Sequence, residues 1–214
     1  MKKSILVLLL ATAVVACNAQ TKKSGAGIQK VNLNPPKGKA IAAFAEGCFW
    51  CSEKIFESVN GIDSVIAGYA GGTKAYPTYE EVSSETTGHA ESVLVYYNPQ
   101  KISYRELVKI FFASHDPTTK DQQGPDVGAS YRSVLFYRNA EEKQRATLTI
   151  QELSRTGQFK RPIVTELKPL NEFWRAEEYH QDFAKKNPNQ SYIRNVSNPR
   201  YEQFKKNYQA EKKK

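Results

Sequence analysis

The sequence has few of the residues that build metal sites and disulfide frameworks. Its three histidines, His89, His115 and His180, show no paired-ligand spacing, so we expect no metal site. It also lacks internal repeats and, after the first fifteen residues, any apolar run long enough to span a membrane. Cys48 and Cys51 lie three positions apart and would close too short a loop for a structural disulfide. Their spacing indicates redox chemistry, a metal or chance, and the histidines argue against the metal.

The first residues have the layout of a secretory signal. Residues 1–3 carry positive charge, residues 4–15 are almost entirely apolar, and a small residue precedes Cys17. This end resembles the box that bacterial lipoprotein signal peptidases recognise, in which the cysteine is lipidated and becomes the new N-terminus. We therefore expect a signal peptide at 1–17 and a lipid anchor on Cys17 that holds an exported lipoprotein in the cell envelope, facing the periplasm or the cell surface. An ordinary signal peptide cut near Ala19 is the alternative.

The rest of the chain divides into a tether and one domain. Residues 18–37 are predicted to form a flexible tether, because their Lys, Ser, Gly, Asn and Pro cannot bury enough apolar surface to fold. Residues 38–214 suffice for one domain that buries about 70% of its unfolded surface. The formal net charge of +9 is concentrated at 2–3, 22–23 and 211–214, outside or at the end of this domain. We therefore expect solvated surface charge and no nucleic-acid partner.

Apolar periodicity predicts strands alternating with helices. Strands are expected at 39–45, 62–69, 90–97, 131–137 and 163–167, and helices at 48–59, from the N-cap Ser103 onward, and at 140–154. The order strand, helix, strand, strand, helix, strand is that of the ferredoxin-like split βαβ unit. The predicted fold class is therefore α+β, a two-layer core with appended helices and strands. The C-terminal stretch is expected to form short helices with loops.

Cys48 falls where the first strand meets the first helix. Unpaired N–H groups and the positive end of the helix dipole favour a thiolate there, and the thiolate is the reactive form. Four interpretations of Cys48 and Cys51 compete: two small buried hydrophobic residues, a zinc site, a thioredoxin-like oxidoreductase, and a nucleophile with a resolving partner. The helix start, the preceding Gly47 and the export signal argue against two idle thiols.

Six segments decide among these interpretations. They are Gly47-Cys48-Phe49-Trp50, Gly68-Tyr69-Ala70-Gly71-Gly72, Pro77-Thr78-Tyr79, Thr87-Gly88-His89-Ala90-Glu91, His115-Asp116-Pro117-Thr118, and Asp126-Val127-Gly128 leading into Tyr131-Arg132-Ser133. In this order they resemble the signature of the A-type peptide methionine sulfoxide reductases. The resemblance covers residues 42–179, nearly the whole predicted domain.

The resemblance implies that residues 38–214 form a catalytic reductase domain for methionine sulfoxide, with Cys48 as the nucleophile. Glu91 matches the family acid, and partial burial would keep its carboxyl protonated near neutral pH. Tyr79 and Tyr131 match tyrosines whose hydroxyl groups hold the sulfoxide oxygen. Asp126 matches an acid that helps to organise this network.

Two aromatic residues complete the implied site. Phe49 and Trp50 match the pocket that receives the S-methyl group of the substrate, which suits the favourable contact between sulfur or methyl and aromatic rings. Without the resemblance, core packing would be the preferred explanation of every aromatic residue named, and a solvated strand end the preferred explanation of Glu91.

The resemblance also implies how the enzyme is recycled. Turnover leaves a sulfenic acid on Cys48, which condenses with a nearby thiol. The family's resolving cysteines often lie in the C-terminal tail, which has none here, whereas Cys51 stands where the family often has glycine. We expect a Cys48–Cys51 disulfide, reduced by a thioredoxin-like dithiol with no bound cofactor.

The expected substrate is the S epimer of methionine sulfoxide, in oxidised envelope proteins or as the free amino acid, since each epimer needs its own enzyme. Two rival functions stay open at this point. A general thiol–disulfide exchanger would not depend on Glu91, and a binding module would use the aromatic pair Phe49-Trp50 with inert cysteines.

Overall fold

A computed structural model describes residues 27–208. The predicted signal peptide, the predicted lipidation site Cys17 and residues 18–26 of the predicted tether lie outside the described residues. The elements are β1 (Gln29–Lys30), β2 (Ala40–Glu46), α1 (Phe49–Glu57), β3 (Ile62–Ala70), α2 (Tyr79–Ser83), β4 (Ala90–Tyr97), α3 (Tyr104–Ser114), β5 (Gln122–Gln123), β6 (Asp126–Val127), the 3-10 turn Ala129–Tyr131, β7 (Ser133–Tyr137), α4 (Ala140–Arg155), β8 (Glu166–Pro169), β9 (Phe173–Arg175), the 3-10 turn Glu178–His180, α5 (Phe183–Lys186), a π-helix (Ile193–Ser197) and α6 (Asn198–Asn207). Within residues 27–208, no helix combines the length and the apolar character needed to cross a membrane.

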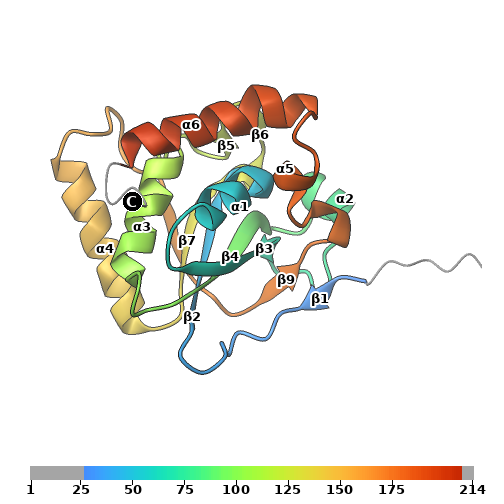
Figure 1. Cartoon of the computed structure of the whole chain (residues 1–214), viewed down its shortest axis with the longest axis horizontal. Coiled ribbons are helices and arrows are strands. Elements are labelled where there is room, and N and C mark those ends of the chain that lie inside the picture. Colours follow the sequence, from blue (N-terminus) through green and yellow to red (C-terminus); the bar gives the residue numbers. More distant parts are fainter. Residues whose placement is uncertain (1–26, 209–214) are drawn as a thin grey trace, which may run out of the picture.

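The centre of the molecule is a seven-stranded mixed sheet in the order β1-β9-β3-β4-β2-β7-β8 (Figure 1). Neighbouring strands run antiparallel except β7 and β8, which run parallel. The helices α1 and α3 pack on one face of the sheet, and α6 lies across both of them. This arrangement confirms the predicted α+β class.

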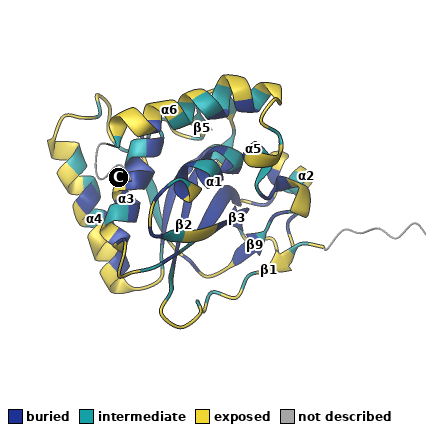
Figure 2. Ribbon diagram, in the orientation of Figure 1, coloured by how far each residue is buried: buried dark blue, intermediate teal, exposed yellow. Residues whose placement is uncertain are grey.

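Both faces of the central strands are buried, as the dark strands of Figure 2 show. In β2, Ala42 and Phe44 belong to the cluster under the helices, whereas Ile41 and Ala43 belong to a second cluster on the opposite face. A strand covered on two sides needs apolar residues at every position, because successive side chains point to opposite faces. The continuous apolar run at 39–45 therefore encodes a central strand.

Most predicted elements are present with boundaries shifted by a few residues. Ser103 caps α3 as predicted, with its side chain accepting a hydrogen bond from the backbone N–H of Glu106. The prediction missed several short pieces of regular structure: β1, α2 between the strands expected at 62–69 and 90–97, the strands β5, β6 and β9, and the π-helix. Tyr131 lies in a 3-10 turn. The strand that was predicted to begin at Tyr131 begins at Ser133 instead.

The prediction of a flexible tether is wrong for its described part. Gln29 and Lys30 pair with Arg175 and Trp174 of β9, and the backbone N–H of Val31 donates to the carbonyl of Phe173 at 2.8 Å. The physical reason is the edge of the sheet: an edge strand presents unpaired N–H and C=O groups that a passing segment can satisfy. Composition alone does not reveal such a partner.

The turn between β2 and α1 places the reactive cysteine. Gly47 has φ +91, and a Cβ at this position would lie 2.5 Å from Cβ of Gln123, so only glycine fits without rearrangement. Cys48 then occupies the N-cap of α1, with φ −53 and ψ 122. The strand thus delivers Cys48 to the start of a helix, as the sequence predicted.

Candidate active site

The two cysteines face each other across the first turn of α1. Cys48 is 6% exposed and Cys51 is 1% exposed, and the backbone N–H of Cys51 donates to the carbonyl of Cys48 at 3.1 Å. Both thiols are free. The pair is therefore positioned to close a disulfide within one helical turn, and Cys48 is the member nearer to the solvent.

The charge of the thiol pair differs from the expectation. Burial raises the pKa of the Cys48 thiol, and the hydrogen bond with Cys51 raises it further. The pKa of Cys51 is lowered, first by the hydrogen bond that its sulfur receives from Cys48, against the opposing effect of burial, and then by the positive charge of Arg200. The helix start was expected to favour the thiolate at Cys48, but the surroundings favour it at Cys51.

Glu91 lies beside the nucleophile in a dry environment. It comes from β4, is 3% exposed, and its Oε2 accepts a hydrogen bond from the backbone N–H of Phe49 at 3.0 Å. Burial raises the pKa of Glu91 to about 8, although the Phe49 N–H bond opposes this shift. The carboxyl is consequently neutral near pH 7 and able to donate a proton.

Three more predicted residues join this group from separate elements. Tyr79 begins α2, Asp126 begins β6, and Tyr131 ends the 3-10 turn before β7. Burial raises the pKa of both tyrosines, and the nearby charges of Glu91, Cys48 and Asp126 raise them further. Burial also raises the pKa of Asp126. Both phenols therefore remain protonated hydrogen-bond donors.

The segment before α2 fixes Tyr79. Thr78 caps this short helix through a capping box, in which its side chain accepts from the backbone N–H of Glu81 while the Glu81 carboxylate accepts from Thr78. The backbone N–H of Tyr79 donates to Glu177 at 2.9 Å, and Glu177 also accepts the hydroxyl of Tyr69 at 2.8 Å. The capping box and the hydrogen bond to Glu177 thus fix the position of Tyr79, in a segment where no helix was predicted.

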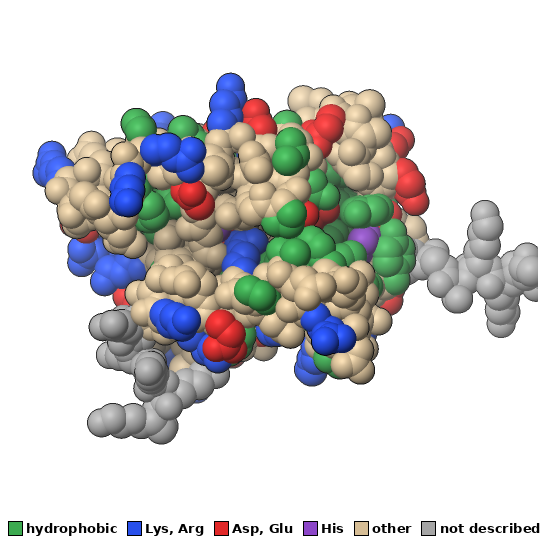
Figure 3. Space-filling view, turned by 90° about the horizontal axis from the view of Figure 1, so that it is seen from above, with side chains coloured by type: hydrophobic (Ala, Val, Ile, Leu, Met, Phe, Trp, Pro, Cys, Tyr) green, Lys and Arg blue, Asp and Glu red, His purple; other side chains and the backbone are tan. Residues whose placement is uncertain are grey.

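Phe49 and Trp50 form an aromatic wall with residues from the C-terminal region. The indole Nε1 of Trp50 donates to Nδ1 of His180 at 3.1 Å, and its ring stacks on Phe183 with a centroid separation of 3.8 Å. Phe49 lies 4.9 Å from the His180 ring. Burial lowers the pKa of His180 to about 4, so the imidazole is neutral and Nδ1 can accept the indole proton. Figure 3 shows hydrophobic side chains gathered on one side of a hollowed face.

A sequence model of the family described as peptide methionine sulfoxide reductase matches residues 40–213. The chain belongs to the peptide methionine sulfoxide reductases. This match covers every site residue described above and extends through α6, beyond the segments that carried the resemblance. The chain is an oxidoreductase of the A type, and members of this type reduce methionine sulfoxide.

Relatives and solved structures agree with this assignment. The MsrA reductase of Methanosarcina acetivorans is 50% identical over 153 residues, which are 72% of this chain and 81% of the relative. Reduced Mxr1 of Saccharomyces cerevisiae matches with a TM-score of 0.69 and 32% identity, over 78% of this chain and 92% of that one. Mxr1 in complex with Trx2 matches with a TM-score of 0.50 and 26% identity, over 70% and 88%.

The reductase site also contains residues that the sequence did not single out. Tyr192 lies between Asp126 and the cysteine pair. Its hydroxyl donates to Oδ2 of Asp126 and lies 4.0 Å from the sulfur of Cys51. Tyr192 precedes the π-helix in a segment that was predicted only as short helices with loops. With 12 tyrosines in the chain, spacing gives no signal for this one.

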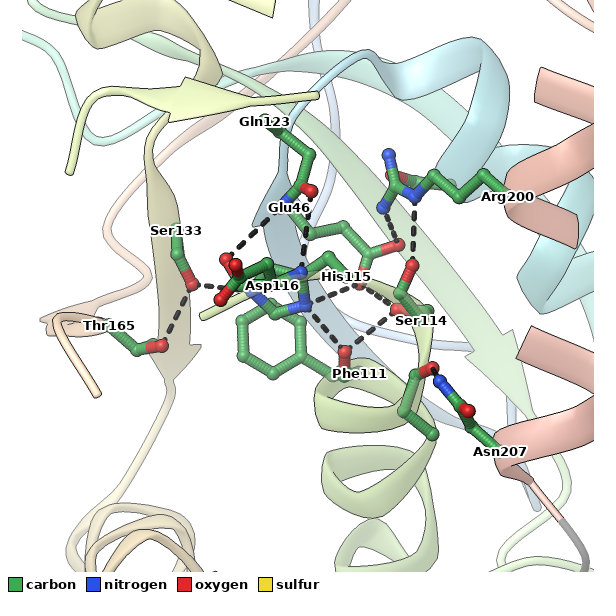
Figure 4. Close-up of polar contacts among 12 residues, drawn as sticks. Glu46, Phe111, Ser114, His115, Asp116, Gln123, Ser133, Thr165, Arg200 and Asn207 are labelled. Atoms are coloured by element: carbon green, nitrogen blue, oxygen red, sulfur yellow. Dashed lines mark hydrogen bonds and ion pairs between the residues drawn. The ribbon is translucent and has the colours of Figure 1, made fainter. Parts of the chain in front are cut away.

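A second polar group, around Glu46 and Arg200, lies near Cys51. Figure 4 shows the contacts within this group. Glu46, the last residue of β2, is fully buried and pairs with Arg200 of α6, whose NH2 lies 2.9 Å from Oε1 of Glu46. The Ser114 hydroxyl donates to the other carboxylate oxygen at 2.5 Å, and Nδ1 of His115 lies 3.7 Å from it. None of these four side chains was predicted to belong to the site.

Residues 27–208 contain no group of three or more His, Cys, Asp or Glu side chains that is placed to hold a metal ion.

Proposed function

We propose that this reductase converts methionine S-sulfoxide, in proteins or as the free amino acid, to methionine through a sulfenic acid on Cys48. The observation that carries the proposal is the buried, neutral Glu91 beside the N-cap thiol, with Phe49 N–H holding the carboxyl in place. The sulfur of Cys48 attacks the substrate sulfur and a transient sulfur–sulfur bond forms. That bond and the sulfur–oxygen bond of the substrate then break as the sulfoxide oxygen passes to Cys48. The thiol becomes a sulfenic acid and the sulfoxide becomes a thioether, so atoms and electrons balance.

The neighbouring side chains fit the parts of this reaction. Glu91 gives its proton to the departing oxygen, as a general acid with a pKa near the working pH does well. The hydroxyl groups of Tyr79 and Tyr131 hold that oxygen, and Asp126 orders the network through Tyr192. The rings of Phe49 and Trp50 receive the S-methyl group.

Cys51 is the resolving thiol of the proposed cycle. Its thiolate attacks the sulfenic sulfur of Cys48, a disulfide forms, and hydroxide leaves and becomes water by taking up a proton. A thioredoxin-like dithiol then reduces the disulfide, so electrons come from a protein partner and no bound cofactor is needed. The backbone geometry of the pair and the solved complex of Mxr1 with Trx2 support this part.

A single-turnover assay tests the chemistry. The reduced protein, mixed with methionine S-sulfoxide and no reductant, is expected to yield one methionine per chain and a protein lighter by the two hydrogens of a new disulfide. Cys48→Ser should yield none, and the R epimer should not react. If the protein reduced an unrelated disulfide by thiol–disulfide exchange but formed no methionine, this would support the rival oxidoreductase and overturn the proposal.

The export prediction becomes a second part of the proposal. The apolar N-terminal run that ends at Cys17 supports an envelope lipoprotein whose anchor holds the reductase at a membrane, where it repairs oxidised envelope proteins. Cys17→Ser is expected to move the protein from the membrane fraction to the soluble fraction of cells that export it. An unlipidated N-terminus in the mass spectrum of the wild-type mature chain would contradict this.

We also infer that the strands β2, β3, β4 and β7, with α1 and α3, form the ferredoxin-like split βαβ unit. Their order in the sheet, β3-β4-β2-β7 with antiparallel neighbours, supports this assignment. The remaining strands extend that unit at its two edges. Superposition of these six elements on a ferredoxin-like domain is the test, and a poor fit of α3 would contradict the inference.

A further inference from the structure

The buried pair Glu46–Arg200 lies where a charge can act on Cys51. Arg200 reaches under the turn that precedes α1: its NH1 atom lies 3.5 Å from the place that a Cβ on Gly47 would occupy. Its Nε donates to the carbonyl of Ser114 at 2.8 Å, and its NH2 pairs with Glu46 at 2.9 Å. The guanidinium is thus clamped at both ends beside the cysteine helix (Figure 4).

The clamp is surrounded by other elements on most sides. The Arg200 side chain is 13% exposed and that of Glu46 is 0% exposed. A guanidinium in such a place keeps its charge, and a charge acts more strongly in a poorly hydrated interior than in water. Glu46 offsets part of this charge, so the field at Cys51 depends on both partners.

We propose that Arg200 is a positioning residue of the recycling steps: held in place by Glu46, it makes Cys51, rather than Cys48, the anionic sulfur of the pair. This inference rests on the proposed role of Cys51 as the resolving thiol. The inference adds that Arg200 prepares Cys51 for this role. It also says which sulfur attacks and which leaves in each exchange reaction.

The direction follows from thiol chemistry. As a thiolate, Cys51 attacks the sulfenic sulfur of Cys48, a sulfur–sulfur bond forms, and hydroxide leaves. In the resulting disulfide, the thiolate of the partner attacks Cys48, which is the more exposed sulfur, and Cys51 leaves as a thiolate. The thiol with the lower pKa leaves faster, so the same Arg200 charge assists both steps. The partner is oxidised in the next exchange and the Cys48–Cys51 dithiol is restored.

The groups that face Cys51 come from several elements. They are Cys48 before α1, Glu46 in β2, Glu91 in β4, Tyr192 before the π-helix and Arg200 in α6. Four of them carry negative charge or none, and Arg200 is the cation of this set. The pKa of Cys51 is lowered in spite of its burial, first by the hydrogen bond with Cys48 and then by the nearby cation Arg200.

Two substitutions with opposite expected effects test the proposal. Arg200→Met removes the cation, so the first thiolate of the reduced protein should form about one pH unit higher. Glu46→Gln leaves Arg200 unbalanced, so the same thiolate should form at lower pH than in the wild type. The titration is followed by the ultraviolet absorbance of the thiolate. A role limited to packing would not move the two profiles in opposite directions.

Kinetics on the same variants connect the titration with recycling. After one equivalent of methionine S-sulfoxide, disulfide formation at about pH 5 should slow by up to about tenfold in Arg200→Met, because below both pKa values the thiolate fraction falls tenfold for each unit that the pKa rises. Arg200→Lys should restore most of the rate because it keeps the charge. Lys206→Met, which removes an exposed cation from the same helix, is the matched control and should match the wild type.

The results separate this inference from the proposed function. If the wild type forms no Cys48–Cys51 disulfide, the resolving role of Cys51 fails, whereas the thiolate titration still reports on Arg200. If Arg200→Met and Glu46→Gln shift the titration in the same direction or not at all, the inference is overturned. Should Arg200→Met not fold, the pair Glu46→Gln and Arg200→Lys still decides, since the first must lower the profile and the second must leave it near the wild type.

Discussion

Two buried glutamates flank the cysteine helix, and their surroundings make them different acids. Glu91 and Glu46 are 3% and 0% exposed, and burial raises the pKa of the first to about 8 and of the second to about 7. Glu91 receives one backbone N–H and faces other acidic groups, whereas Glu46 receives Ser114 and the guanidinium of Arg200. The same side chain thus becomes a proton donor on one side of the helix and half of an ion pair on the other.

This difference divides the cycle between the two sides. The neutral Glu91 belongs with the sulfoxide oxygen, because a departing oxygen needs a proton. The Glu46–Arg200 pair acts on Cys51, because a resolving thiol must ionise to attack and the Arg200 cation favours the thiolate. Cys48 lies between them and takes part in both steps.

The largest effect is expected from removing the proton donor. Glu91→Gln keeps the size and the hydrogen bond to Phe49 but loses the acidic proton, so methionine formation in a single turnover should fall by ~10²–10⁴-fold. The measurement is rapid-quench kinetics with the S epimer. Glu46→Gln is the matched control on the neighbouring strand and should affect this step far less. Equal losses in the two variants would remove the distinction between the two sides.

The next effect concerns recycling alone. Cys51→Ser should still form one methionine per chain, because Cys48 retains its place, but turnover with a thioredoxin-like dithiol should fall by ~10²-fold, since no internal disulfide forms. Mass spectrometry after one equivalent of substrate should find a sulfenic acid on Cys48. Normal dithiol-driven turnover in Cys51→Ser would assign resolution to another group.

Local signals in the sequence account for much of the fold. The buried strand at 39–45, the turn at Gly47 and the N-cap Ser103 were predictable, because periodicity and capping act over a few residues. The strand β9 was not, because its three residues gain their place only by pairing with β3 and β1. The same holds for the described part of the predicted tether.

The site was predictable only where a motif reported it. The resemblance named Glu91 and Tyr131, and the structure brings both to Cys48, whereas Arg200 lies 154 positions from Glu46 and neither carries a local signal. A lone arginine in a polar helix predicts a solvated face. Its burial against β2 depends on the path of the whole C-terminal region, which no short pattern encodes.

Stability should respond in the opposite sense to activity. The pKa of Glu91 rises from its ordinary value of 4.5 to about 8 in the folded chain, so the folded state keeps a proton that the unfolded state releases between these values. The free energy of unfolding therefore falls as pH rises through this window. Glu91→Gln should raise it by about 4 kcal/mol at pH 8 and leave it unchanged below pH 4.5. Urea unfolding at both pH values measures this.

The matched variant sharpens that result. Glu46→Gln removes a carboxylate that is paired with Arg200, so the gain from avoiding a buried charge is offset by an arginine left without its partner. We expect a smaller stabilisation at pH 8 for this variant than for Glu91→Gln, because burial raises the pKa of Glu46 only to about 7, against the opposing charge of Arg200. A stabilisation equal to that of Glu91→Gln would mean that the ion pair contributes nothing to the fold.

The smallest effect is expected at the aromatic wall, which belongs to the Glu91 side of the comparison. Trp50→Phe keeps the ring but removes the indole N–H that donates to His180, a bond worth ~0.5–1.5 kcal/mol. The wall should become less ordered, and KM for methionine S-sulfoxide should rise about 2- to 10-fold with little change in kcat. Trp174→Phe is the control, because its buried Nε1 has no hydrogen-bond partner among residues 27–208. An unchanged KM in Trp50→Phe would show that the substrate does not meet this wall.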